Sequence, residues 1–240
     1  MLFLPSLLEY SSESLNRKLL EVKNRLNDFQ KIQNPLNNTD KKYASKKVNN
    51  PVGEGSLAFH LDFVLPYFAK DRKVMTSLGL ESILNELAKL FSDFNLDLSI
   101  HLMGTSEDLF EAHKFFLDYS FKQNWKYTVF VPEKYTSTFW PQTQIFSNYK
   151  VGIWYDLNDY SLNKIEQNKA IENYLLMTVL AGKSGQKLNS SKQQLCLELC
   201  AKFADKKFIV DGGWGVDYKN ILTNLEVVSY SSFWNKFERN

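Results

Sequence analysis

Two histidines and two aspartates lie within short apolar runs or directly at their ends. His60 and Asp62 belong to one run, His101 belongs to the next, and Asp211 ends a run much later in the chain. Two imidazoles and two carboxylates form a complete nitrogen and oxygen shell for one borderline divalent metal. The sequence therefore predicts a metal centre at these four residues, with zinc or ferrous iron as the first expectation and manganese or cobalt as alternatives.

The His-x-Asp pair is a weak signal when taken alone. His60 and Asp62 alternate along one expected strand, so both side chains point to the same face. A core histidine with a satisfied hydrogen bond, beside a helix cap, gives the same pattern. The signal gains force from His101 and Asp211, because the second, third and seventh strand ends converge on one mouth only in a closed barrel.

Glycine-bearing segments add a second kind of chemistry. The stretches 182–185 and 212–213 each follow an apolar run that resembles a buried strand. Backbone N–H groups in such loops, where helices begin, favour phosphate dianions. Tight strand-to-helix turns also need glycine for conformational reasons, so the loops alone are weak evidence. Together with the metal ligands they suggest a metal-assisted enzyme acting on a small phosphorylated substrate.

The elements that must position these residues follow from hydrophobic periodicity. Eight apolar runs alternate with amphipathic helical patterns such as 13–29, 80–91 and 192–203. We expect strands near 2–4, 57–63, 97–103, 127–131, 151–155, 173–178, 207–211 and 226–229. This rhythm predicts an α/β fold, a single (β/α)8 TIM barrel over residues 1–240. Periodicity alone also allows an open, doubly wound sheet.

Two segments depart from the rhythm. Residues 30–55 are polar and nearly devoid of core-forming side chains, so we expect an exposed insertion after the first helix. Its lysines could form an interaction surface, although a solvated loop explains them as well. After Phe237 only three residues remain, which leaves room for a short final helix.

Composition narrows the class of partner and the compartment. The net charge is +2, from 29 basic and 27 acidic residues, so no excess charge favours nucleic acid or anionic lipid. The apolar start lacks a basic flank, and no run approaches the roughly 18 residues of a membrane span. Cys196 and Cys200 share one helix face, where core packing is a simpler role than a metal or redox pair. We expect a cytoplasmic protein, and the oligomeric state stays open, a homo-oligomer included.

Several motifs together resemble the ribulose-phosphate 3-epimerase family of metal-dependent (β/α)8 barrels. They keep the family's order over essentially the whole chain, apart from the insertion. The motifs are Leu4-Pro5-Ser6-Leu7-Leu8, His60-Leu61-Asp62, His101-Leu102-Met103, Val151-Gly152-Ile153, Met177-Thr178-Val179, Gly185-Gln186-Lys187 and Val210-Asp211-Gly212-Gly213.

The resemblance implies interconversion of ribulose 5-phosphate and xylulose 5-phosphate by inversion at carbon 3. That carbon is a weak acid, so a metal is needed to stabilise the enediolate. Inversion also needs proton transfer on two faces, for which Asp62 and Asp211 match the family's acid and base. Predicted substrate contacts are Ser6, His101, Met103 and Met177, although core packing would explain the methionines alone. Predicted phosphate contacts are Gly182, Lys183, Ser184, Gly185, Gly212, Gly213, Tyr230 and Ser231.

The chain also departs from the family. Phe63-Val64-Leu65-Pro66 stands where the family usually has Val-Met-Asp-Gly, and Tyr230 stands where it has glycine. Tyr230 would block or reshape the phosphate pocket, and Lys183 would either compensate with its charge or face solvent. Two other functions therefore stay open: a non-catalytic barrel that binds metal or sugar phosphate, and an epimerase of six-carbon ketose phosphates.

Overall fold

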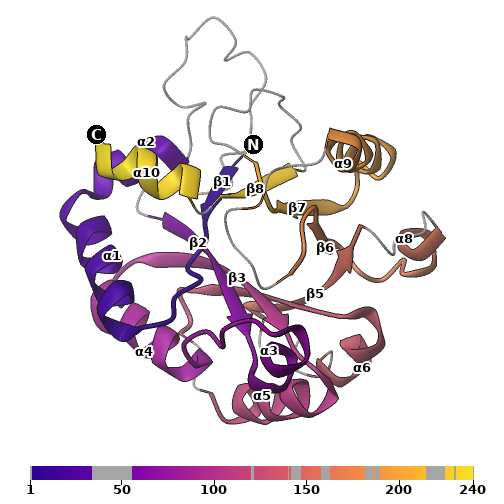
Figure 1. The fold of residues 1–240 in the computed structure, drawn as a ribbon, viewed down its shortest axis with the longest axis horizontal. Helices are drawn as coiled ribbons and strands as arrows, with labels where there is room; N and C mark the ends of the chain where they lie inside the picture. The colour runs from indigo at the N-terminus through magenta and orange to yellow at the C-terminus, as the bar shows by residue number, and fades with distance from the viewer. Residues whose placement is uncertain are drawn as a thin grey trace, which may run out of the picture.

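Eight parallel strands form a nearly closed barrel, with helices on its outside (Figure 1). The computed structural model describes residues 2–33, 56–119, 122–139, 141, 147–157, 163–181, 186, 190–214, 225–229 and 231–239. The strands are β1 (Leu2–Pro5), β2 (Ser56–Val64), β3 (Asn95–Met103), β4 (Lys126–Val131), β5 (Tyr149–Asp156), β6 (Asn173–Met177), β7 (Lys207–Asp211) and β8 (Leu225–Ser229). The predicted (β/α)8 barrel is confirmed, and each predicted strand coincides with an observed one.

The barrel closes between β1 and β2 through one isolated bridge. The sheet order runs from β1 through β8 and back to β2, and Ser6 and His60 then join its two ends. The Leu7 N–H donates to the His60 carbonyl oxygen at 2.8 Å across the same seam. This closure excludes the open sheet and draws the carboxyl ends of all strands toward one mouth.

Helices connect the strands and cover the barrel. Those described are α1 (Ser12–Asn24), α2 (Leu26–Gln33), α3 (Pro66–Arg72), α4 (Leu80–Phe91), α5 (Ser106–Asp118), η3 (Glu133–Tyr135), α6 (Thr136–Phe139), α8 (Asn163–Gln167), α9 (Ser190–Lys202) and α10 (Ser231–Arg239). The predicted helix over 80–91 is confirmed at both ends. None of the helices described is both long and apolar enough to cross a lipid bilayer.

The predicted first helix over 13–29 is wrong at its carboxyl half. The chain leaves helical geometry at Arg25, whose φ and ψ are −125° and 42°, and α2 begins one residue later. The break turns Phe29 inward, where its ring centroid lies 5.2 Å from that of Phe233 and 5.7 Å from that of Phe237. The short final helix α10 thus packs on α2, as Figure 1 shows.

The start of the predicted exposed insertion also needs correction. Residues 30–33 complete α2, and Ile32 and Gln33 are buried. The Gln33 side-chain amide hydrogen-bonds the backbone of Ala58 on β2, which gives this polar residue a structural role. The rest of the predicted insertion, 34–55, lies outside the described residues.

Strand residues alternate between two apolar layers. One layer lies between strands and helices, and it contains Cys196 and Cys200, as expected for cysteines that pack in the core. The other fills the barrel interior with Leu4, Ala58, Phe130, Leu175, Met177, Ile209 and Val228. Gly152 belongs to the interior positions of β5, where an added Cβ would come within 2.5 Å of the Phe130 ring. Glycine is needed there to make room for that ring.

Candidate metal centre and active site

Three of the four predicted ligands come from two adjacent strands. Asp62 and His101 are register partners on β2 and β3, and His60 lies two residues before Asp62. All three side chains are buried inside the mouth of the barrel. The Asp62 Oδ1 atom faces both imidazoles, 3.2 Å from His60 Nε2 and 3.1 Å from His101 Nδ1.

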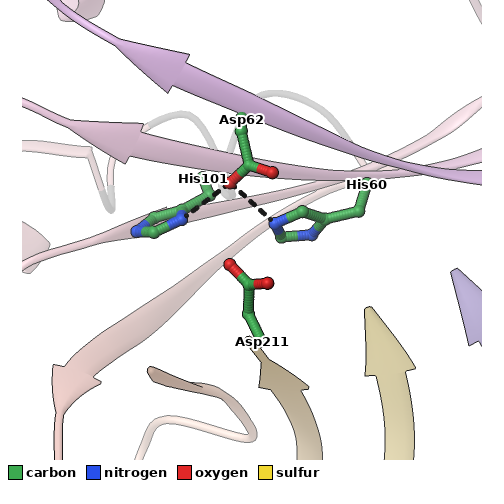
Figure 2. Close-up of side chains that lie close together, drawn as sticks. All are labelled: His60, Asp62, His101 and Asp211. Carbon is green, nitrogen blue, oxygen red and sulfur yellow. Dashed lines mark hydrogen bonds and ion pairs between the residues drawn. The ribbon is translucent and has the colours of Figure 1, made fainter. Parts of the chain in front are cut away.

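The fourth ligand arrives from the other side of the barrel. Asp211 ends β7, and Figure 2 shows its carboxylate directed toward Asp62 across the space between the two imidazoles. One ligand atom from each of the four side chains lies within 4.8 Å of all the others. The structure therefore brings together all four residues that the sequence analysis selected, and this cluster could hold a metal ion.

Hydroxyl groups hold the ligands in place. The Ser6 hydroxyl donates to Asp62 Oδ2 at 2.6 Å, and the Ser99 hydroxyl lies 2.9 Å from His60 Nδ1. When His60 Nδ1–H donates to Ser99, the Nε2 lone pair is left for a ligand, which is a common arrangement around metal-bound histidines. Ser6 was predicted as a substrate contact, and the structure places it against a ligand carboxylate.

Two positioning residues were missed from the sequence. Ser99 precedes His101 by two residues on β3, so strand alternation alone puts both on the barrel interior and could have indicated it. Thr178 follows β6, and its hydroxyl donates to the carbonyl oxygens of Asp211 and Gly212. Because Thr178 N–H also donates to the Asp211 carbonyl at 2.8 Å, the end of β7 is tied to the end of β6.

The predicted glycine pair has a clear conformational role. Gly212 and Gly213 have φ values of 111° and 74°, which lie in the region that favours glycine. A Cβ on Gly212 would come within 2.3 Å of Val179. The pair turns the chain sharply directly after Asp211 and so leaves its carboxylate in the mouth. Phosphate binding by the pair stays a prediction.

The two carboxylates have opposite electrostatic surroundings. Burial raises the pKa of Asp62, but the two imidazoles outweigh it and hold this pKa well below its usual range. Burial and the negative charge of Asp62 raise the pKa of Asp211 to about 7. Burial lowers the pKa of His60, but the charge of Asp62 more than compensates and leaves it raised, whereas burial dominates for His101 and lowers its pKa.

These shifts show that, without a metal, Asp62 favours its ionised form and Asp211 its protonated form, because Asp211 is buried beside the negative charge of Asp62. A divalent cation would favour ionised carboxylates and neutral imidazoles. It would thereby offset the electrostatic repulsion between the Asp62 and Asp211 carboxylates. His101 turns its Nδ1 toward the cluster, 3.1 Å from Asp62 Oδ1 (Figure 2). The donor set, its compactness and its burial all fit a divalent metal.

The predicted methionines lie on the walls near the cluster. Met177 belongs to the barrel interior and is the register partner of Asp211. Met103 packs with Val64, Phe68 and Ala69, of which the last two are on α3. Both positions are buried and apolar, which suits either core packing or a dry wall beside a reacting substrate.

The family departure at Leu65 and Pro66 has a structural explanation. Leu65 precedes α3 and Pro66 is its first residue, a position where proline is favoured. Asp108, on α5, caps this helix by accepting from the N–H groups of Tyr67 at 3.0 Å and Phe68 at 2.9 Å. The segment after β2 is therefore a docked helix, and it leaves the four ligand positions intact.

Most predicted phosphate contacts lie outside the described residues. These are Gly182, Lys183, Ser184, Gly185 and Tyr230. Ser231 is the first residue of α10. Gln186 is described, and its side-chain amide hydrogen-bonds both backbone groups of Leu180. The phosphate site predicted at these loops stays a prediction.

Comparison with known proteins adds no identification. No protein-family model matches the chain, and no curated protein matches it. The case for a function therefore depends on the barrel and on the residues at its mouth.

Proposed function

We propose that the protein is a divalent-metal-dependent ribulose-phosphate 3-epimerase, which interconverts D-ribulose 5-phosphate and D-xylulose 5-phosphate. The observation that carries this proposal is the buried cluster of His60, Asp62, His101 and Asp211 at the carboxyl end of a closed barrel. Active sites of such barrels lie at this end. The sequence motifs resembling the epimerase family add support, since they surround the same residues.

Two imidazoles and two carboxylates would hold the ion. His60 would offer Nε2, because Ser99 occupies its Nδ1. When bound, a zinc or ferrous ion would lower the pKa of the proton on carbon 3, because it would polarise the neighbouring oxygens of the substrate. Ser6 keeps the Asp62 carboxylate oriented through its 2.6 Å hydrogen bond.

Inversion at carbon 3 by proton transfer requires two acid–base groups on opposite faces of the substrate. Asp62 and Asp211 approach the shared space from opposite sides, from β2 and β7 (Figure 2). One carboxylate removes the carbon 3 proton, which leaves a planar enediolate, and the other delivers a proton to the opposite face. In the reverse direction the two roles exchange. No net oxidation occurs, and one proton is taken up for each that is released.

The walls of the mouth would keep water from the planar carbanion. Met103, Met177 and the ring of Trp154 are apolar and lie around the cluster, with Trp154 and His101 ring centroids 5.1 Å apart. A dry site strengthens electrostatic interactions and prevents protonation by solvent. These residues would therefore favour transfer between the two aspartates and the substrate.

The test is epimerisation of ribulose 5-phosphate by purified protein, after chelation and after zinc or ferrous iron is added back. The proposal expects turnover that chelation abolishes and metal restores. Asp62→Asn and Asp211→Asn should lose turnover, whereas Asp97→Asn, on β3 at the other end of the barrel, should keep it.

Other outcomes separate the alternatives. Faster turnover of a six-carbon ketose 6-phosphate than of ribulose 5-phosphate would indicate the hexulose-phosphate reaction. Folded, metal-loaded protein without turnover of either substrate would overturn the proposal and favour a non-catalytic barrel.

A further inference from the structure

A buried ion pair lies outside the metal cluster, near the start of the chain. It joins Glu9, in the segment after β1, to Lys18 on α1, and the two side chains are only 3% and 10% exposed. The Ser14 hydroxyl donates to the second carboxylate oxygen of Glu9, Oε2, at 2.6 Å. The Leu78 N–H donates to the Glu9 carbonyl oxygen at 2.8 Å. Burying such a pair costs desolvation energy, and neither the metal shell nor the proton transfer uses it.

The ammonium group of this pair lies over the ring of a buried tryptophan. Lys18 Nζ is 5.1 Å from the ring centroid of Trp234, which is on α10 and 4% exposed. The rings of Phe233 and Phe237 pack against the same indole, with centroid distances of 5.6 Å and 6.0 Å. A cation over the face and two aromatic rings at the edges favour one orientation of the indole.

The indole ring in turn contacts the segment that contains Ser6. The Trp234 N–H donates to the Ser6 carbonyl oxygen at 2.9 Å, although the two residues lie 228 positions apart in the sequence. Figure 1 shows α10 beside α2 and close to β1, and it packs on both. An indole has a single N–H to donate, so the ring orientation decides where that hydrogen bond goes. The backbone of Ser6 therefore has a defined partner on the last helix.

Ser6 links this network to the metal cluster. Its hydroxyl donates to Asp62 Oδ2 at 2.6 Å, and its backbone is bridged to that of His60 where the barrel closes. The other carboxylate oxygen, Asp62 Oδ1, faces both imidazoles. A shift of the Ser6 backbone would move the hydroxyl that orients this carboxylate. Groups that orient metal ligands in this way usually contribute to metal affinity.

We propose that Trp234 is a positioning residue for the metal centre, which acts through Ser6 on the Asp62 carboxylate. The Glu9–Lys18 pair holds the indole ring, and the indole N–H holds the Ser6 carbonyl. The inference rests on the metal centre of the proposed function, but it needs no epimerase turnover. It gives α10 a part in zinc affinity from a position outside the ligand shell.

The experiment measures the zinc affinity of the full-length protein by competition with a fluorescent chelator. Ser6→Ala removes a hydrogen bond to a ligand and should weaken zinc binding by about tenfold. Trp234→Phe keeps an aromatic ring but loses the N–H donor, and it should weaken zinc binding by a smaller factor, about threefold or more, because it acts one contact further away.

Trp125→Phe is the matched control. Trp125 is also buried, and its indole N–H also donates to a backbone carbonyl, that of Phe94, at 3.1 Å. It directly precedes β4, so it lies at the amino end of the barrel, away from the metal cluster. Its substitution should lower the free energy of unfolding and leave the zinc affinity unchanged.

The double variant Ser6→Ala, Trp234→Phe tests whether Trp234 acts through Ser6. Residues that belong to one network give non-additive effects. Once the Ser6 hydroxyl is gone, Trp234→Phe should lower the zinc affinity no further. A general structural role of Trp234 would instead lower the affinity by the same factor with and without that hydroxyl.

A second replacement keeps the test decisive where Trp234→Phe does not fold. The amino acid β-(3-benzothienyl)alanine at position 234 has the shape of tryptophan, but a sulfur atom takes the place of the N–H. It should reproduce the loss of zinc affinity and keep the packing with Phe233 and Phe237. Urea unfolding measures the stability of each variant separately from its zinc affinity.

Three results would overturn the positioning role of Trp234. They are an unchanged zinc affinity after loss of its N–H, equal losses with and without the Ser6 hydroxyl, and an equal loss in Trp125→Phe. Turnover separates this inference from the proposed function. A protein that binds zinc with the expected pattern but does not epimerise ribulose 5-phosphate keeps the positioning role and loses the reaction, whereas an active enzyme whose zinc affinity ignores Trp234 keeps the reaction and loses the positioning role.

Discussion

The two ends of the barrel interior both contain charged side chains, but they balance these charges differently. At the amino end, Lys207 on β7 forms a 2.8 Å ion pair with Glu226 on β8. At the carboxyl end, Asp62 and Asp211 share a small space with two imidazoles. The groups that shift the pKa values of these two aspartates include no lysine or arginine among the described residues.

The difference separates a structural charge pair from a binding site. Glu226 has a cation from a neighbouring strand, which offsets part of the rise that burial causes in its pKa. The carboxyl end has two acids whose surroundings push their pKa values apart, which is typical of functional sites. A mobile divalent ion would supply the charge that Lys207 supplies at the other end.

The largest expected effect is on catalysis at the carboxyl end. Asp62→Asn or Asp211→Asn removes one of the two proposed proton-transfer groups, so kcat for ribulose 5-phosphate should fall by about a thousandfold or more. Coupled enzyme assays of the epimerisation in each direction measure kcat. If the kcat of either variant equalled that of the unmodified protein, other residues would have to transfer the protons.

Breaking the pair at the amino end should change stability and leave the metal site unaffected. Glu226→Gln should lower the free energy of unfolding by about 1–3 kcal/mol. This is less than for a fully buried pair, because the Lys207 side chain is 40% exposed. Urea unfolding measures the loss, and Glu172→Gln, in an exposed pair with Lys150, is the control. Loss of metal affinity in Glu226→Gln would contradict the separation of the two ends.

The free energy of unfolding of the metal-free protein should depend on pH through the raised pKa of Asp211. Because the pKa of Asp211 rises from 3.8 to about 7, the folded state holds a proton that the unfolded chain has released. The free energy of unfolding from this group therefore falls as pH rises from about 4 to 7.

Asp211→Asn removes the ionisable group and with it the fall in the free energy of unfolding. The metal-free variant should therefore be more stable than the unmodified protein at pH 8 by about 1–2 kcal/mol. The gain should vanish near pH 4, and saturating zinc should reverse the ranking. Melting temperatures across this pH range check it. Identical pH profiles for the two metal-free proteins would argue against the raised pKa.

A smaller effect should come from the group that orients His60. Ser99→Ala removes the partner of His60 Nδ1, and metal affinity should fall by about tenfold, as is usual for such supporting hydrogen bonds. Competition with a fluorescent zinc chelator measures the affinity. Thr128→Val, at the register partner of Ser99 on β4, is a matched control on the barrel interior. An unchanged affinity in Ser99→Ala would mean that His60 needs no orienting partner.

The sequence was sufficient to predict the strands and the four clustered residues. Each strand is a separate apolar run, and parallel strands in a closed barrel must bring their carboxyl ends together. His60, Asp62, His101 and Asp211 therefore needed only correct strand positions, which periodicity supplies.

Other features depend on tertiary contacts that periodicity does not encode. The end of α1 at Arg25 follows from the packing of Phe29 under α10, and the helical pattern continues through that position in the sequence. Asp108 lies in the first turn of α5, and only the structure shows that it also caps α3.

The most direct test of the contrast between the two ends is metal stoichiometry. Metal-free protein would be titrated with zinc by calorimetry, alongside His60→Ala, Asp211→Asn and Glu226→Gln. We expect one ion per chain, lost or greatly weakened in the first two variants and unchanged in the third. Absence of stoichiometric binding, or binding that His60→Ala and Asp211→Asn leave intact, would contradict a metal centre at the mouth of the barrel.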